Sequence, residues 1–163
     1  ATIKGFEPLY IQRIAQLTNK SNQFNLTTLR CSEDDIRAMA GDKNDLCLCG
    51  KLVDKFGDNG IVTVVAGRQQ GDVLDLTLWL MSCRVLKRGM EDAMMDTVVA
   101  EAAARGVKTI VGHYYPTAKN AMVREFYAQY DFAKTAEDAD GNTEWTLDIA
   151  AYTPKHPHMK IER

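Results

Sequence analysis

The stretch that decides the fold is Leu78-Trp79-Leu80-Met81-Ser82-Cys83-Arg84-Val85-Leu86-Lys87-Arg88-Gly89-Met90-Glu91. An apolar run ends at Ser82, a basic turn follows, and Gly89 opens a long amphipathic segment, which predicts a strand, a turn and a helix N-terminus. Backbone N–H groups at such a turn have no partner inside the helix, and the helix dipole adds partial positive charge there. An acyl or phosphate oxygen can dock on these groups. Cys83 lies at the start of this turn. If the chain catalyses a reaction, we expect the active site at this turn.

Composition predicts an ordinary soluble globular chain with one domain over residues 1–163. The 163 residues are 45% hydrophobic and 26% charged, enough for one sizeable core. A formal charge of −2 argues against a general nucleic-acid binder. No apolar run approaches the roughly 20 residues of a membrane span, and there is no signal peptide. Free thiols and seven methionines fit a reducing cytoplasm.

The four cysteines do not predict a disulfide framework or a metal site. Cys47 and Cys49 have the spacing of residues that point to the same face of a strand. A zinc site needs a second Cys or His pair at ligand spacing, and the sequence offers none. We therefore expect no metal.

The first forty residues predict a short strand, two helices and a polar loop between the helices. Alternation suggests an edge strand at Ile3 to Phe6, and Pro8 suits the first turn of a helix that continues to about Thr18. Ser32 is the expected N-cap of a second helix, which ends near Gly41. The loop from Thr18 to Thr28 is crowded with amides and hydroxyls. It is either a solvated loop or a lid that hydrogen-bonds a polar ligand.

The middle of the chain predicts an antiparallel meander. Its strands and turns are Leu46 to Val53, a turn at 56–60, Ile61 to Ala66, a turn at 67–72, and Val73 to Met81. After Gly89 the apolar period changes to that of a helix, which continues to Arg105 and ends at Gly106.

The C-terminal third predicts a strand at Val107 to Gly112, a helix opened by Pro116, and a final hairpin turned at Asp140-Gly141. The tail from Thr153 to Arg163 is expected to be peripheral. Because the strand after a crossover helix lies parallel to the strand before it, the order predicts a mixed α/β sheet with one βαβ unit. Its two neighbouring parallel strands, 73–81 and 107–112, can splay and leave a cleft between their C-terminal ends.

This order resembles the GNAT acyl-CoA N-acyltransferase fold. Asn120-x5-Phe126-Tyr127-x4-Phe132 is similar to the Asn…(Leu/Phe)-Tyr-x3-Gly-Phe signature of the last helix of that fold, with Asp131 in place of its glycine. Four stretches together resemble the C-terminal GNAT-like domain of FkbH-type proteins. They are Thr18-Asn-Lys-Ser-Asn-Gln-Phe-Asn-Leu-Thr-Thr28, Phe56-Gly-Asp-Asn-Gly60, Trp79-Leu-Met-Ser-Cys-Arg-Val85 and Pro116-Thr-Ala-Lys-Asn120.

The FkbH resemblance implies an acyltransferase of polyketide precursor supply. Such proteins move a glyceryl unit from 1,3-bisphosphoglycerate onto an acyl carrier protein through a cysteine thioester. They carry a HAD phosphatase-like domain before this one, and we do not expect that domain within this chain. The implied partners are an acyl carrier protein and a small acyl donor, and the oligomeric state is left open.

One departure from the GNAT pattern bears on the cofactor. The pyrophosphate loop of the fold reads Gln/Arg-x-x-Gly-x-Gly/Ala, whereas this chain has Leu86-Lys-Arg-Gly-Met-Glu91. A carboxylate at that turn would repel the pyrophosphate of CoA by on the order of 1 kcal/mol. The phosphopantetheine arm of a carrier protein has one phosphate and tolerates this better, so we expect the arm as cofactor, with acetyl-CoA or CoA as the alternative.

Three residues are the candidate catalytic groups. Cys83 and His113 end the two splayed strands, and a thiolate beside an imidazole and a helix N-terminus is an acyl acceptor. The alternatives are an inert buried thiol and a capping histidine. By the resemblance, Tyr127 stands where many GNAT enzymes keep a general acid, although it can equally be a packed aromatic.

Binding roles are expected at the polar loop and at the two turns. The candidate substrate-binding residues are Asn22, Gln23, Asn25, Ser82 and Arg84. The candidate cofactor-binding residues are Lys87, Arg88, Gly89 and Asn120. The plain alternatives are solvated charges and a capping asparagine. Three functions stay open: an FkbH-type acyltransferase, an acetyl-CoA-dependent N-acetyltransferase, and a non-catalytic module that docks a carrier protein.

Overall fold

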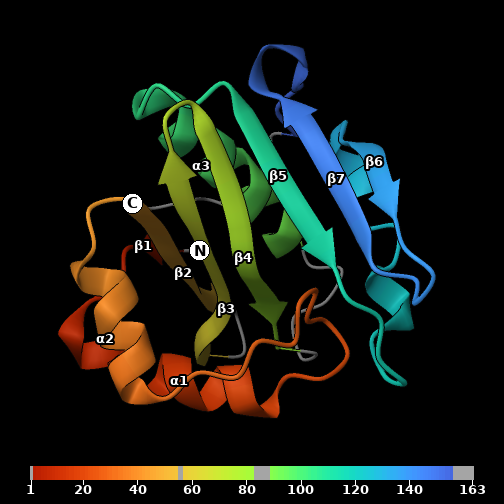
Figure 1. The fold of residues 1–163 in the computed structure, drawn as a ribbon. Helices are drawn as coiled ribbons and strands as arrows, with labels where there is room; N and C mark the ends of the chain where they lie inside the picture. The colour runs from red at the N-terminus through yellow and green to blue at the C-terminus, as the bar shows by residue number, and fades with distance from the viewer. Residues whose placement is uncertain (1, 55–56, 83–88, 156–163) are drawn as a thin grey trace.

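The computed structural model describes residues 2–54, 57–82 and 89–155, and these form a mixed α/β fold around one twisted sheet (Figure 1). The seven-stranded sheet has the order β1-β2-β3-β4-β5-β7-β6. The strands are β1 (Thr2–Lys4), β2 (Asp45–Asp54), β3 (Gly57–Gln70), β4 (Val73–Met81), β5 (Thr109–Tyr114), β6 (Ala133–Glu137) and β7 (Thr143–Asp148). The helices are η1 (Pro8–Tyr10), α1 (Ile11–Lys20), α2 (Glu33–Gly41), α3 (Met90–Ala104), η3 (Ala121–Val123), η4 (Tyr127–Tyr130) and η5 (Ile149–Ala151). The predicted fold class is confirmed.

Helices cover the two faces of the sheet unequally. α3 packs on one face along the middle of the sheet, and α1 and α2 pack on the other face over β2 and β3 (Figure 1). Among the described residues, no helix stands in front of β5 and β7 on the α1 and α2 side (Figure 1). Side chains of β5 and β7 that point to this side are partly exposed, as in an antiparallel sheet with one face toward solvent.

Local signals set the helix ends. The Ser32 hydroxyl accepts a hydrogen bond from the Asp35 amide, and the Asp35 carboxylate accepts one from the Ser32 amide, which is a complete capping box. Gly106 follows α3 with φ of 78°, a left-handed conformation that glycine adopts without steric cost. Both predicted helix boundaries are confirmed.

The meander of β2, β3 and β4 is antiparallel as predicted, but β3 is longer than its apolar core. The prediction ended this strand at Ala66 and assigned residues 67–72 to a turn. In the structure Gly67 to Gln70 continue the ladder against β4, and the turn shrinks to Gly71 and Asp72. Backbone pairing needs no apolar side chain, so hydrophobic patterning underestimates the polar end of a hairpin.

A bulge in β4 parts this strand from β5. Ala66 of β3 pairs with Leu78 and Gly67 pairs with Leu76, which leaves Thr77 as an extra residue. Extra residues of this kind bend a strand and shift its alternation. Leu76 and Trp79 both face α3 in consequence. The parallel pairing of β4 with β5 stops just before the bulge, at Asp75 and Val111, and the predicted splay is confirmed.

The predicted helix after Pro116 is wrong. The segment forms two short 3-10 turns, η3 and η4, with hydrogen bonds from residue i+3 to residue i, such as Phe126 N to Val123 O. The apolar residues Val123, Phe126, Tyr127 and Tyr130 are spaced at i, i+3, i+4 and i+7, which is the pattern of an α-helix face and misled the prediction. All four are buried as predicted for such a face, although the backbone forms 3-10 turns.

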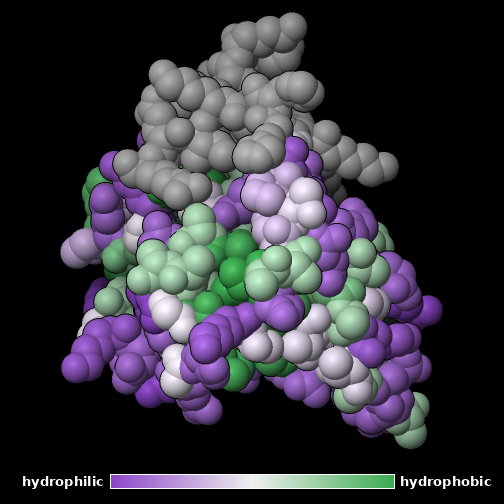
Figure 2. All heavy atoms as spheres, turned by 90° about the horizontal axis from the view of Figure 1, so that it is seen from above, coloured by the Kyte–Doolittle hydropathy of each residue, from purple (hydrophilic) through white to green (hydrophobic). Residues whose placement is uncertain are grey.

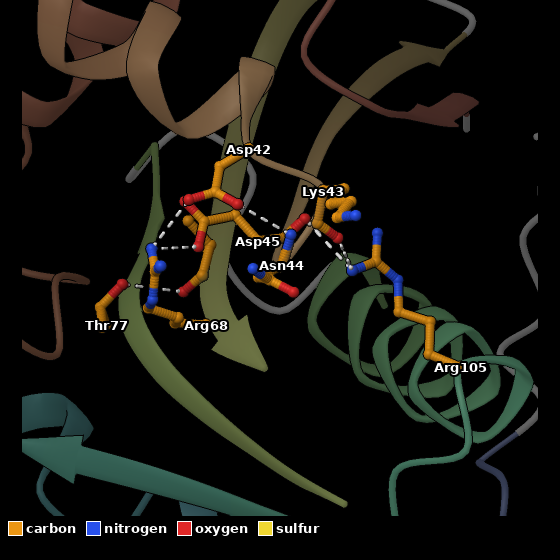
Figure 3. Close-up of polar contacts among 8 residues, drawn as sticks. Asp42, Lys43, Asn44, Asp45, Arg68, Thr77 and Arg105 are labelled. Atoms are coloured by element: carbon orange, nitrogen blue, oxygen red, sulfur yellow. Dashed lines mark hydrogen bonds and ion pairs between the residues drawn. The ribbon is translucent and has the colours of Figure 1, made fainter. Parts of the chain in front are cut away.

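An ion network ties the α2–β2 connection to the sheet and to α3 (Figure 3). The Arg68 guanidinium lies 3.0 Å from Asp42 and 3.3 Å from Asp45. Arg105, just after α3, donates to the carbonyl oxygens of Lys43 and Asp45. Three elements that are distant in sequence are therefore held at one end of the sheet.

In the described part of the chain, no helix combines the length and the apolar character that crossing a bilayer requires. Viewed from above, the surface formed by the described residues is largely hydrophilic around a narrow hydrophobic strip (Figure 2). Where the described residues form it, this side of the molecule offers no broad hydrophobic area.

Replacing Gly112 by alanine is expected to destabilise the fold. A Cβ at this position would lie 2.4 to 2.8 Å from three ring carbons of Tyr127, and overpacking of this kind costs about 1–3 kcal/mol. The free energy of unfolding measured in denaturant tests the effect. Gly41→Ala is the control, because its Cβ would have no neighbour within 4 Å; an equal loss in both variants would contradict the packing argument.

Candidate functional site

A histidine and an aspartate meet on the open face of the splayed strands. His113 of β5 and Asp75 of β4 lie on the side of the sheet away from α3, and His113 Nε2 is 2.6 Å from Asp75 Oδ1. The side chain of His113 is 21% exposed and that of Asp75 is 48% exposed, so solvent and ligands reach both. The predicted site residue His113 is therefore accessible, and it has a partner that the sequence analysis missed.

This pair has the geometry of an oriented base. A proton on Nε2 shared with the carboxylate leaves Nδ1 of the imidazole as a free acceptor, because the two ring nitrogens of a neutral histidine take opposite roles. The carboxylate also stabilises the imidazolium that forms when His113 accepts a proton. The pair can thus remove a proton from a thiol, hydroxyl or amine.

Tyr115 and Glu144 complete this open site. The Tyr115 ring stacks on the His113 ring, with centroids 5.9 Å apart and planes inclined by 29°. Glu144 of β7 lies opposite His113 in the sheet register. Burial raises the pKa of the Tyr115 phenol, and the charges of Asp75 and Glu144 raise it further. Tyr115 therefore stays neutral near pH 7 and can donate a hydrogen bond.

One signal in the sequence points to this site. Asp75 interrupts an otherwise apolar strand, and the strand predicted to lie beside it carries His113. The sequence did not reveal that the side chains of Asp75 and His113, which are 38 positions apart, meet diagonally across the splay.

Three of the predicted substrate-binding residues meet in one hollow at the C-terminal end of β4. Asn22, Gln23 and Ser82 all line this hollow, which has a volume of about 560 Å³. Its apolar lining comes from Leu17, Phe24 and Met81. Ser82 directly precedes Cys83 in the chain, so the hollow adjoins the predicted nucleophile along the sequence.

The loop between α1 and α2 runs past the ends of β4 and β5 (Figure 1), and its residues Phe24–Leu26 lie alongside the end of β4, with an isolated antiparallel β-bridge between Asn25 and Leu80. Leu26 N donates to Trp79 O, and Met81 N donates to Phe24 O, both at 3.0 Å. On the other side, Tyr115 N donates to Leu26 O at 2.8 Å. The segment Phe24–Leu26 therefore uses the backbone groups of β4 that the splay leaves without a partner on β5.

Two asparagine side chains hold the segment Phe24–Leu26 in place. The Asn120 amide donates to Asn25 O at 2.9 Å and Tyr115 O at 3.0 Å, and its oxygen accepts from Thr117 N at 2.7 Å. The Asn25 side-chain N–H donates to Ser21 O, and the Asn25 side-chain oxygen accepts a hydrogen bond from Thr28 N. Both asparagine side chains are fully buried and engaged within the protein, so in this arrangement neither is open to a ligand.

Tyr127 lies in an aromatic cluster under β4 and β5. It is 1% exposed and packs against Phe132, Phe126 and Trp79 with ring centroids 4.8 to 6.4 Å apart. Burial, followed by the charge of Asp75, raises its phenol pKa well above the usual range. As a proton donor it would serve only a group that reaches into this cluster.

The predicted phosphate turn is described only at its end. Gly89 has φ of 84° and is the N-cap of α3, a left-handed conformation that suits glycine. Four predicted site residues lie outside the described residues: Cys83, Arg84, Lys87 and Arg88. The proximity of Cys83 to His113 stays a prediction, as do the binding roles of the other three residues.

The described cysteines are poor nucleophiles. Burial is the main cause that raises the thiol pKa values, to about 12 for Cys47 and about 11 for Cys49, and it also raises that of Cys31. All three stay protonated at neutral pH. Among residues 2–54, 57–82 and 89–155, no group of three or more His, Cys, Asp or Glu side chains is arranged to hold a metal ion.

Sequence comparisons find no match, neither to a known family nor to a curated protein. Solved structures do match. The ribosomal-protein-S18-alanine N-acetyltransferase of Escherichia coli is 14% identical with a TM-score of 0.67, over 96% of this chain and 98% of that one. The GNAT domain of S. lividans PAT has 15% identity and a TM-score of 0.68, over 90% of this chain and 89% of that one. Rv2747 of Mycobacterium tuberculosis, solved in complex with CoA and NLQ, has 12% identity and a TM-score of 0.68, over 90% of this chain and 98% of that one. The chain therefore has the GNAT acetyltransferase fold.

Proposed function

We propose that this chain is an acyltransferase that moves a small hydroxyacyl group, such as glyceryl, through a thioester on Cys83 to the phosphopantetheine thiol of an acyl carrier protein. The observation that carries the proposal is the His113–Asp75 pair, held at 2.6 Å on the open face of the two splayed strands. The GNAT fold supports acyl transfer as the class of reaction. The FkbH-like motifs support the hydroxyacyl group and the carrier protein.

The reaction has two balanced steps. The Cys83 thiolate attacks the carbonyl carbon of the acyl donor, a C–S bond forms, and the donor's leaving group departs with its electron pair. His113 then takes the proton of the carrier thiol, which attacks the thioester carbon. The bond to Cys83 breaks, and the imidazolium returns the proton to the departing sulfur.

Two features beyond the catalytic pair support this route. The hollow lined by Asn22, Gln23 and Ser82 offers the side-chain amides of Asn22 and Gln23 to a hydroxylated acyl chain, directly before Cys83 in the chain. The other three cysteines are held as protonated thiols. Cys83 is thus the cysteine left as candidate for a covalent step.

Acetyl-CoA-dependent N-acetylation is the second candidate, and the solved neighbours favour it, one of which was crystallised with CoA. Glu91 weighs against it, because a carboxylate in the first turn of α3 would repel the pyrophosphate of CoA. The segment Phe24–Leu26, which holds the edge of β4 with hydrogen bonds to Trp79 and Met81, does not separate the candidates, because CoA and the carrier arm share the same pantetheine chain. Tight CoA binding in calorimetry would favour this second function, and carrier-protein binding without thiol reactivity would favour a docking module.

Cys83→Ser is expected to abolish covalent loading while the fold survives. The test incubates the protein with a glyceryl thioester of N-acetylcysteamine and weighs it intact by mass spectrometry, where one glyceryl adduct is expected on the unsubstituted protein. Cys47→Ser, which removes a thiol with a raised pKa, is the control and should load normally. An adduct that persists in Cys83→Ser removes this residue from the mechanism.

His113→Gln is expected to slow transfer to the carrier thiol by about 100-fold or more, the usual contribution of a positioned base. Asp75→Asn is expected to lower the rate less, because the amide still holds the ring but no longer stabilises the imidazolium. Single-turnover transfer from the loaded protein to a holo carrier protein measures both. Asp72→Asn, in the β3–β4 turn, is the charge-matched control; rates unchanged in His113→Gln would overturn the role of the pair.

A further inference from the structure

Trp79 carries a buried hydrogen-bond donor that has no partner. Its side chain is 1% exposed, and among the described residues its indole Nε1–H is the one buried side-chain nitrogen or oxygen without a hydrogen bond. The other tryptophan, Trp145, is buried as well, but its Nε1–H donates to the Thr143 hydroxyl at 2.9 Å. Because an unsatisfied buried donor is costly, folded proteins seldom keep one, and the Trp79 indole calls for an acceptor from outside the chain.

Two phenylalanine rings connect this donor to the hollow at the end of β4. Phe24 lines the hollow, and its ring packs edge-on against the ring of Phe126, with centroids 5.1 Å apart. The Phe126 ring in turn packs edge-on against Trp79, again with centroids 5.1 Å apart. All three belong to the core cluster on the α3 side of the sheet. The indole therefore lies beneath the floor of the hollow, and two aromatic rings link it to that floor.

The Phe24 ring can move without disturbing the segment that carries it. Phe24 O accepts a hydrogen bond from Met81 N, and Leu26 N donates to Trp79 O, both at 3.0 Å. These bonds use main-chain groups only, so another staggered rotamer of the Phe24 side chain leaves them intact. Movement of this ring, followed by that of Phe126, would extend the hollow to the indole.

The surroundings of the indole select an uncharged acceptor. Its ring neighbours are Phe126 and Tyr127, with centroids 5.1 and 6.4 Å from that of Trp79. A carboxylate or phosphate placed among these rings would lose its hydration without gaining a counter-charge. An ammonium group is excluded as well, because the indole N–H is only a donor. The donor therefore fits a small carbon chain that carries an uncharged oxygen.

We propose that Trp79 determines which acyl group the protein accepts, by donating its indole N–H to a hydroxyl group at the far end of the acyl chain. The inference rests on the proposed function, which keeps the reacting carbonyl at Cys83 and leaves the far end of the chain to enter beneath the floor of the hollow. It separates the two hydroxyls of a glyceryl group, because the terminal one is bound and the one beside the carbonyl is not. An acyl group without the terminal hydroxyl leaves the donor unpaired and gains nothing there.

The indole N–H signals of the isotope-labelled chain test this contact by NMR. The Cys83→Ser variant is used so that thioesters bind without reacting, and the probes are the glyceryl, 3-hydroxypropionyl, lactyl and propionyl thioesters of N-acetylcysteamine. The Trp79 indole proton is expected to move downfield with the first two probes and to stay in place with the other two. The Trp145 signal should stay in place throughout, because its donor already bonds Thr143. A Trp79 signal that moves with none of the probes, or equally with all four, overturns the proposal.

Trp79→Phe removes the donor and keeps an aromatic ring, and Trp145→Phe is the matched control at the other buried tryptophan. With Cys83 intact, the chain is expected to load 3-hydroxypropionyl about tenfold faster than propionyl, as followed by intact mass. Trp79→Phe should bring this ratio close to one, whereas Trp145→Phe should preserve it. The ratio compares two probes on the same protein, so a general loss of stability does not change it. A preference that survives in Trp79→Phe contradicts the proposed contact.

The two measurements also separate this inference from the proposed function. Equal loading of Cys83 by all four probes would retain the proposed function and reject only the role of Trp79. A Trp79 signal that responds to the terminal hydroxyl, in a protein that never forms an adduct, would support the contact and reject the covalent route.

Discussion

The extra residue at Thr77 is the constraint on which the rest of the structure depends. A single bulge bends β4 and shifts its alternation, so that Asp75 faces the open side while Trp79 faces α3. Because the bend begins where pairing with β5 stops, it both opens the splay and places the Asp75 carboxylate beside His113.

The splay creates a problem of hydrogen bonding that the chain solves itself. The groups released on β4 include Trp79 O, Met81 N and Thr77 O, and a buried backbone group left without a partner costs about 1–3 kcal/mol. Phe24–Leu26 satisfies the first two, and the Thr27 hydroxyl donates to Thr77 O at 2.8 Å. The buried side chain of Asn120 then fixes this segment to the end of β5, so one loop closes the sheet and forms a wall of the hollow.

The two parts of the candidate site differ in charge, which suggests different tasks. Carboxylates surround the imidazole of His113, where positive charge develops when it accepts a proton. Among the described residues, the lining of the hollow at the end of β4 includes Arg13, Lys20 and Lys119 and no carboxylate.

The sequence by itself determined the elements and their order. Hydrophobic period, the Ser32 cap and Gly106 predicted the helices α1, α2 and α3 and the meander, because these signals act within a few residues of one another. Tertiary structure alone decided which distant groups meet: Asp75 with His113, and Phe24–Leu26 with the edge of β4. It also decided that the segment after Pro116 forms 3-10 turns, which the spacing of its apolar residues does not distinguish from a helix. Periodicity records which side of a segment is buried, but the partner that buries it is chosen by the fold.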